Sequence, residues 1–230
     1  GLMLALSRRM VPADKFMRAG KYKGWDPNLF LGMDLTGKTL GIVGPGTIGA
    51  VVGKRAQAVF DMQVVYACRH ECEEFEQVTG GKRVELEELL KLADVVSLHV
   101  PLTAETRHMI SFKELALMKP TAILINTARG PVVEEKALRL AVEAKKIWGA
   151  ALDVYEEEVA AEHAHLDPED WRTLKDLDNV ILTPHIASAT VEGREEMTRL
   201  AVNNILMALS GRRPENLVNQ EVEQKKGGEA

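Results

Sequence analysis

The sequence has few cysteines, no excess of basic residues and no long apolar run. Two of its 230 residues are Cys, too few for a disulfide framework, and such scarcity is typical of a reducing compartment. We therefore expect a cytoplasmic protein. Lys and Arg number 29 against 34 Asp and Glu, so we expect no nucleic-acid partner. The apolar runs are much shorter than the roughly 20 residues that a membrane-spanning helix needs, so we expect no membrane partner.

The remaining composition is that of a globular protein, with 46% hydrophobic and 27% charged residues. Apolar, β-branched runs alternate along the chain with segments of helical periodicity. We expect strands at 39–43, 63–67, 95–100, 122–126, 149–154 and 180–182, and helices at 47–59, 84–92, 112–118, 133–145 and 191–209. Strands that are apolar throughout and separated by helices predict an α/β fold with a doubly wound parallel sheet, of Rossmann type.

A glycine-rich G-x-G-x-x-G motif, formed by Gly44, Gly46 and Gly49, lies between the first expected strand and the first expected helix of this pattern. In this context the first glycine permits a tight turn, the second lets the backbone approach a pyrophosphate, and the third lets helix and strand pack closely. The first residues of the expected helix are Thr47 and Ile48. Their free N–H groups and the positive end of the helix dipole face the phosphates of a bound dinucleotide. The motif therefore predicts a dinucleotide site.

The end of the second expected strand indicates which dinucleotide is bound. An acidic residue normally stands there and binds the ribose 2′-hydroxyl. Here the position is occupied by Cys68, Arg69 and His70, so no carboxylate repels a 2′-phosphate and a guanidinium is placed to bind one. We predict NADP(H), with NAD(H) as second choice. The alternative is that Arg69 is a solvated charge and that the glutamates within 71–74 reach the site instead.

A metal site is not expected at this strand end. Cys68 and Cys72 flank His70, but two thiols and one imidazole without a fourth ligand nearby make a poor zinc site.

Three further segments place polar residues after expected strands. They read Asn-Thr-Ala-Arg-Gly at 126–130, Asp-Val-Tyr-Glu-Glu-Glu at 153–158 and Thr-Pro-His-Ile-Ala-Ser at 183–188. The carboxyl ends of parallel strands form the ligand crevice of an open α/β sheet. We therefore expect an arginine, a glutamate and a histidine to converge beside the bound dinucleotide.

Taken together with the glycine motif, these segments make the sequence resemble the D-isomer-specific 2-hydroxyacid dehydrogenases over residues 2–219. Segments 24–32 and 111–120 are most similar to the glyoxylate/hydroxypyruvate reductases, and segment 68–70 is similar to members that use NADP. The resemblance implies reduction of a small 2-keto acid, glyoxylate or hydroxypyruvate, to the D-2-hydroxy acid.

The resemblance also implies roles for single residues. His185 corresponds to the general acid/base, Glu158 to the carboxylate paired with it, and Arg129 to the residue that grips the substrate. The choice of Glu158 among its acidic neighbours rests on the family register, five residues after Asp153, which would contact the nicotinamide carboxamide. The other implied contacts of the cofactor are Val100, Pro101, Thr106, Thr127, Ala128 and Ser188, together with Arg129 and His185 themselves.

The family has two domains, and the resemblance implies that most of the substrate domain is missing, because the sequence begins at Gly1 with the apolar stretch 2–6. Residues 1–13 would be the remnant of an interdomain helix and 14–186 the dinucleotide-binding domain. Residues 187–219 would be the returning helix and the end of the substrate domain, and 220–230 a disordered tail. The family also implies a homodimer.

Three alternatives stay open at this point. Within the same family, the chain could be a phosphoglycerate or a phosphite dehydrogenase. Segment 160–173 is longer than expected between Glu158 and His185, as it also is in phosphite-oxidising members of the family, and Val159 stands where the family usually has Pro. In a different class, the chain could be a dinucleotide-sensing, corepressor-like binding protein. It could also be an inactive cofactor-binding fragment.

Overall fold

The computed structural model describes residues 1–156 and 174–219 of the chain. The chain divides into two compact units, Gly1–His185 and Ile186–Ala230, which are described separately below. The expected tail 220–230 lies outside the described residues.

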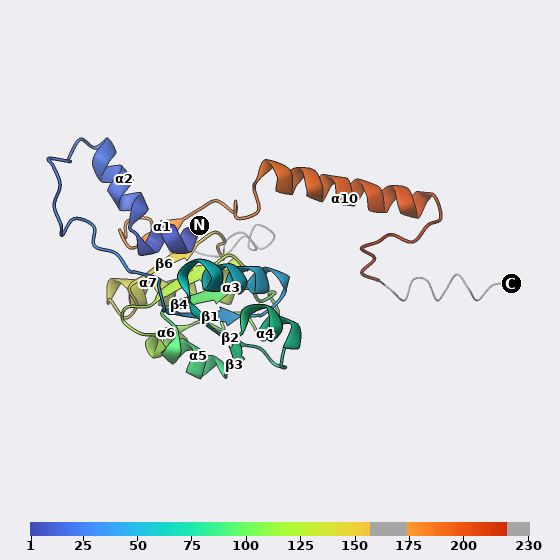
Figure 1. Cartoon of the computed structure of the whole chain (residues 1–230), viewed down its shortest axis with the longest axis horizontal. Coiled ribbons are helices and arrows are strands. Elements are labelled where there is room, and N and C mark those ends of the chain that lie inside the picture. Colours follow the sequence, from blue (N-terminus) through green and yellow to red (C-terminus); the bar gives the residue numbers. More distant parts are fainter. Residues whose placement is uncertain (157–173, 220–230) are drawn as a thin grey trace. The chain divides into compact units, whose positions relative to one another are not determined.

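The first unit is built on a parallel sheet (Figure 1). Within the described residues the sheet has seven strands in the order β3-β2-β1-β4-β5-β6-β7. Their bounds are β1 (Thr39–Val43), β2 (Gln63–Ala67), β3 (Lys82–Arg83), β4 (Val95–Leu98), β5 (Ile123–Asn126), β6 (Gly149–Leu152) and β7 (Val180–Leu182). Each pair of neighbours is parallel, so every strand ends at the same edge of the sheet.

Helices cover both faces of this sheet. Leu6, Ala56 and Phe75 belong to the core cluster on one face, and Leu89 and Leu138 belong to the cluster on the other. The first face carries α1 (Leu2–Ser7), α3 (Thr47–Phe60) and α4 (Glu73–Thr79), and the second carries α5 (Leu86–Leu92), α6 (Phe112–Leu117) and α7 (Glu135–Glu143). The predicted doubly wound α/β fold is therefore confirmed.

Strand β1 shows why residues 40–43 carry no polar side chain. Leu40 and Ile42 pack in one core cluster and Val43 in the other, because successive side chains of a strand point to opposite faces. Gly41 points to the same face as Val43, and a Cβ atom there would lie 2.5 Å from Cδ2 of Leu89. The glycine thus lets α5 pack directly on the central strand.

Three short elements were not expected from the sequence: β3, α4 and α2 (Met10–Arg18), which runs across the domain boundary expected after residue 13. Short helices have little stability of their own, and tertiary contacts hold these elements in place. For α4, the phenol of Tyr66 donates a hydrogen bond of 2.7 Å to Glu76. For β3, pairing with the edge of β2 supplies the hydrogen bonds.

The second unit contains the long helix α10 (Val191–Leu209), as predicted. Its N-terminus is capped by Thr190, whose hydroxyl accepts a hydrogen bond of 2.9 Å from the N–H of Gly193. None of the residues of α10 is buried, and its large exposed apolar residues are Val191, Met197, Val202, Ile205, Leu206 and Leu209. In the described parts of the chain, no helix combines the length and the apolar character needed to cross a bilayer.

Candidate dinucleotide and substrate site

The candidate site residues of the first unit follow strands that end at one edge of the sheet. Strand β1 pairs with β2 on one side and with β4 on the other, so the strand order reverses between β1 and β4. Ligands of open α/β sheets bind at such a switch point, outside the carboxyl ends of the strands. The glycine motif follows β1 and so lies at this position.

The three glycines of the motif have different surroundings. Gly44 has a φ of +90°, and a Cβ atom there would lie 2.8 Å from Cγ1 of Val100 and 2.9 Å from the carbonyl carbon of His99. A Cβ atom on Gly49 would lie 2.9 Å from the carbonyl oxygen of Gly44, so α3 packs directly on the loop. Gly46 has no atom within 4 Å of its Cβ position, which leaves open space beside its backbone.

The start of α3 is suited to an anion. No acidic residue stands in its first turn, no side chain caps its N-terminus, and the residues at 46–48 are exposed. The first N–H groups of the helix are therefore available, and no carboxylate cancels the positive end of the dipole. The open backbone at Gly46 and this helix end together fit a diphosphate.

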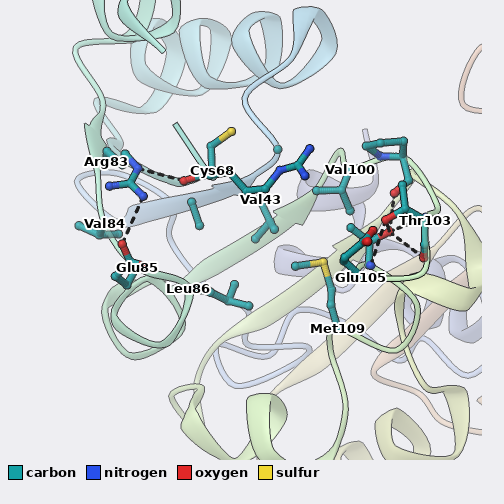
Figure 2. A pocket seen from close by; sticks show the side chains of 15 residues that line it. Val43, Cys68, Arg83, Val84, Glu85, Leu86, Val100, Thr103, Glu105 and Met109 are labelled. Carbon is teal, nitrogen blue, oxygen red and sulfur yellow. Dashed lines mark hydrogen bonds and ion pairs between the residues drawn. The ribbon is translucent and has the colours of Figure 1, made fainter. Parts of the chain in front are cut away.

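A pocket of about 540 Å³ lies beside the loop, a volume within the range of small-molecule and cofactor sites (Figure 2). Its lining includes six residues predicted from the sequence: Gly44, Cys68, Arg69, Val100, Pro101 and Thr106. It also includes residues that the sequence analysis missed, chiefly Arg83, Glu85, Leu86, Thr103, Glu105 and Met109. His70 is exposed and is not part of the lining.

Two pairs of charged residues belong to the pocket. The Arg69 side chain makes no hydrogen bond or short ion pair with another described residue. Its charge nevertheless helps to lower the pKa of the Glu105 carboxyl, to which a hydrogen bond from Thr103 contributes most. In Figure 2, Arg83 and Glu85 lie at one side of the pocket, and Thr103 and Glu105 lie at the other.

The two cysteines lie near each other without forming part of a larger ligand set. Burial raises the pKa of the Cys72 thiol, and the neighbouring Cys68 thiol raises it further. Within 1–156 and 174–219, no three His, Cys, Asp or Glu side chains are grouped as a metal site requires.

The loop after β5 carries Arg129 on a rigid backbone. Asn126 is 1% exposed; its side-chain carbonyl accepts a hydrogen bond of 3.0 Å from the N–H of Ala128, and its amide donates one of 3.0 Å to the carbonyl of Arg129. A Cβ atom on Gly130 would lie 1.9 Å from the backbone carbonyl of Tyr155. The loop therefore packs directly on the segment that follows β6, while the Arg129 side chain stays exposed.

The segments after β6 and β7 are tied to each other. Asp153 is 1% exposed, and the hydroxyl of Thr183 donates a hydrogen bond of 2.5 Å to its carboxylate. The phenol of Tyr155 donates one of 2.9 Å to the carbonyl of Thr183. His185 is exposed and has a φ of +54°, a left-handed conformation that is uncommon outside glycine and that recurs at functional sites.

The sheet thus brings Arg129, Asp153 and His185 to three neighbouring strand ends, in the order β5, β6, β7. Neighbouring strands are about 4.8 Å apart, so the outer two strand ends are separated by roughly 10 Å, which is within the reach of long side chains. Thr127 and Ala128 lie in the loop after β5. Glu158 lies outside the described residues, and Ser188 belongs to the second unit.

Two histidines that had no expected role in the site make specific contacts. Nε2 of His108 lies 2.7 Å from a carboxylate oxygen of Glu156, and the N–H of Glu156 donates a hydrogen bond of 2.7 Å to the buried Glu135. His99 lies next to the glycine motif, where its Nε2 is 2.9 Å from the hydroxyl of Ser97. Burial lowers the pKa of His99 to about 4, so this ring is neutral near pH 7.

Comparison with known proteins identifies what this arrangement is similar to. Residues 1–187 match a family model described as the D-isomer specific 2-hydroxyacid dehydrogenase, NAD binding domain. A glyoxylate reductase from Thermococcus litoralis is 50% identical over 225 residues, which cover 96% of this chain and 65% of that protein. The chain therefore spans slightly less than two thirds of that relative's length.

Solved structures also resemble this chain in fold. A protein of Thermus thermophilus has 45% sequence identity and a TM-score of 0.83, over 94% of this chain and 65% of that one. A glyoxylate reductase from Paecilomyes thermophila has 40% identity and a TM-score of 0.78, over 90% of this chain and 59% of that one.

The partly buried imidazole of His99, beside the glycine motif, predicts a loss of stability in mild acid. The unfolded chain binds a proton at His99 below about pH 6.5, whereas the folded chain binds one only near pH 4, so stability falls as the pH drops through this window. Between pH 7 and pH 5, the free energy of unfolding of wild type should fall by about 2 kcal/mol more than that of His99→Asn. Urea titrations at both pH values measure this, and equal losses in the two proteins would contradict it.

Proposed function

This chain belongs to the D-isomer-specific 2-hydroxyacid dehydrogenase family, and on that premise we propose that it carries the cofactor site of a 2-keto acid reductase. The substrate is a small 2-keto acid, glyoxylate or hydroxypyruvate, and the product is the D-2-hydroxy acid. The main support is that three features lie at one edge of the sheet: the glycine loop, a pocket of about 540 Å³ and three polar strand ends. The similarity to glyoxylate reductases supports the substrate class.

The cofactor supplies a hydride to the keto carbon when it is bound. The chain's own residues have the remaining tasks. Arg129 binds the substrate carboxylate, for which a planar guanidinium with parallel donors is well suited. His185 donates a proton to the carbonyl oxygen, so that the keto group becomes a hydroxyl. Glu158 is the carboxylate that favours the imidazolium form of this histidine.

The rigidity of the strand ends supports these roles. The loop that carries Arg129 is held by the buried Asn126 amide, and the segment before His185 is held by Asp153 and Tyr155. Fixed backbone and exposed side chains are what a site needs in order to position a substrate without reorganising at each turnover.

For the cofactor we propose NADP(H), with NAD(H) as second choice. Segment 68–70 contains no carboxylate, and Arg69 lines the pocket with no short ion pair to a described residue. A guanidinium with unused donors is available for a 2′-phosphate, which offers three acceptor oxygens and up to two negative charges.

We further propose that the protein is a homodimer, as the family resemblance implies. Light scattering at micromolar concentration should give twice the mass of one full-length chain. A monomeric mass at concentrations up to about 100 μM would contradict this proposal.

The catalytic role predicts a separation of turnover from cofactor binding. In the full-length protein, His185→Gln should lower kcat for NADPH oxidation with glyoxylate by roughly 10²–10⁴-fold, because the proton donor is lost. The Kd of NADPH should stay within about twofold, which controls for folding. Unchanged kcat would remove the acid role. Tight NADPH binding without turnover of any 2-keto acid by wild type would instead favour a dinucleotide-sensing binding protein.

The NADP(H) assignment predicts that removal of Arg69 weakens the binding of NADPH but not that of NADH. Arg69→Ala should raise the Kd of NADPH by at least about tenfold and leave that of NADH nearly unchanged, because a charge-assisted hydrogen bond contributes roughly 1.5–3 kcal/mol. Fluorescence titration measures both constants. Arg18→Ala, on the exposed face of α2, is the matched control for loss of one positive charge. Tighter binding of NADH than of NADPH by wild type would contradict the assignment.

A further inference from the structure

We infer that Arg83 is a second specificity-determining cation of the cofactor pocket: it fixes the backbone at the end of β2 and offers its guanidinium to a 2′-phosphate. This inference rests on the proposed NADP(H) site and deepens it. Arg83 stands fifteen residues after Cys68 in the sequence, and no motif points to it. The structure brings the two together (Figure 2).

The two-residue strand β3 places Arg83 beside the nucleotide-binding end of the sheet. In the parallel register Tyr66 lies opposite Arg83, and the N–H of Val84 donates a hydrogen bond of 2.9 Å to the carbonyl of Tyr66. Strand β3 therefore runs alongside the last residues of β2. The side chain of Arg83 reaches past the end of β2 and lines the same pocket as Arg69.

The first contact of Arg83 is with the backbone that carries Arg69. Its Nε–H donates a hydrogen bond of 2.9 Å to the carbonyl of Cys68, the residue immediately before Arg69. Hydrogen bonds from a charged donor are stronger than neutral ones. The side chain of Arg83 is 30% exposed, so water competes less for this bond than at an open surface. The bond thus holds the turn from which the Arg69 side chain departs.

The remaining donors of Arg83 are weakly used. Nη2 lies 3.3 Å from a carboxylate oxygen of Glu85, and the Glu85 side chain is 79% exposed. A long ion pair with such an exposed partner contributes little. Nη1 has no hydrogen-bond partner among residues 1–156 and 174–219. The guanidinium can therefore keep its bond to Cys68 while its two terminal nitrogens turn to a phosphate dianion.

Glu85 affects how much of the Arg83 charge is available to a phosphate. Its carboxylate offsets the charge of Arg83 as long as no phosphate is present, and a 2′-phosphate would have to displace it. Removal of the Glu85 charge should therefore favour NADPH. The opposing possibility is that Glu85 itself accepts the 2′-hydroxyl of NADH, as an acidic residue does in NAD-binding sites. The two possibilities predict opposite effects of the same substitution.

The test compares NADPH and NADH binding by fluorescence titration in wild type, Arg83→Gln and Glu85→Gln. Arg83→Gln should raise the Kd of NADPH by about tenfold or more and that of NADH by less than about threefold. Glu85→Gln should lower the Kd of NADPH by about twofold to fivefold. Arg55→Gln, exposed on α3, controls for general electrostatics. The unfolding midpoint without nucleotide controls for damage to β3.

A double-substitution cycle separates shared phosphate binding from independent effects. If Arg69 and Arg83 bind the same phosphate, their combined effect on the Kd of NADPH should differ from the product of the single effects by about threefold or more. Arg83→Lys keeps the charge but loses the Nε–H that holds Cys68. It should therefore restore only part of the NADPH affinity.

Equal losses for NADPH and NADH in Arg83→Gln would overturn the inference and reduce Arg83 to a structural residue. Weaker NADH binding in Glu85→Gln would assign the choice of cofactor to that carboxylate instead. Either result could occur while wild type still prefers NADPH and Arg69→Ala still binds NADPH more weakly. The inference about Arg83 can therefore fail while the proposed function stands. Failure of wild type to bind either nucleotide would overturn both.

Discussion

The parallel direction of every strand is the constraint on which the candidate site depends. Parallel strands all end at one edge, so the loops after β1, β2, β4, β5, β6 and β7 meet there even though the chain visits them over more than 140 residues. This arrangement requires that helices cover both faces closely. Glycine makes two such close approaches possible: Gly41 against Leu89, and Gly130 against Tyr155. A side chain at either position would separate the layers or push one strand-end loop from the next.

At this edge the polar residues form two groups with different physical roles. Asn126 and Asp153 are buried, and burial of a polar group is costly unless it is hydrogen-bonded. Asn126 is hydrogen-bonded to the backbone of its own loop, at Ala128 and Arg129, whereas Asp153 accepts a hydrogen bond from Thr183 in the segment after the neighbouring strand; both therefore fix the strand ends. Arg129 and His185 are exposed on that fixed backbone. The buried group provides rigidity, and we propose that the exposed group provides the chemistry, which is the division that preorganised sites require.

The cofactor pocket combines apolar walls with charges of both signs. Arg69 and Arg83 are opposed by Glu85 and Glu105, all four in the pocket lining. In the cofactor site that we propose, the choice between a ribose hydroxyl and a ribose phosphate depends on which of these charges are paired with neighbours and which remain available. Hydrogen bonds from Thr103 and the charge of Arg69 stabilise the Glu105 carboxylate, whereas the pair between Arg83 and Glu85 is long and solvated.

The sequence by itself determined the fold class, the glycine loop and the identity of most strand-end residues. Buried parallel strands are apolar at every position, and the loop has a fixed spacing, so both leave a readable local pattern. The sequence could not reveal β3, α4, or the place of Arg83 and Glu85 in the pocket. These elements are short and have no periodicity, and only the pairing of β3 with β2 brings Arg83 to Cys68. The tertiary structure also decided the left-handed backbone of His185 and the contact of Gly130 with Tyr155. The contact of Gly130 with Tyr155 joins two separate strand-end segments, and such a contact leaves no local signal.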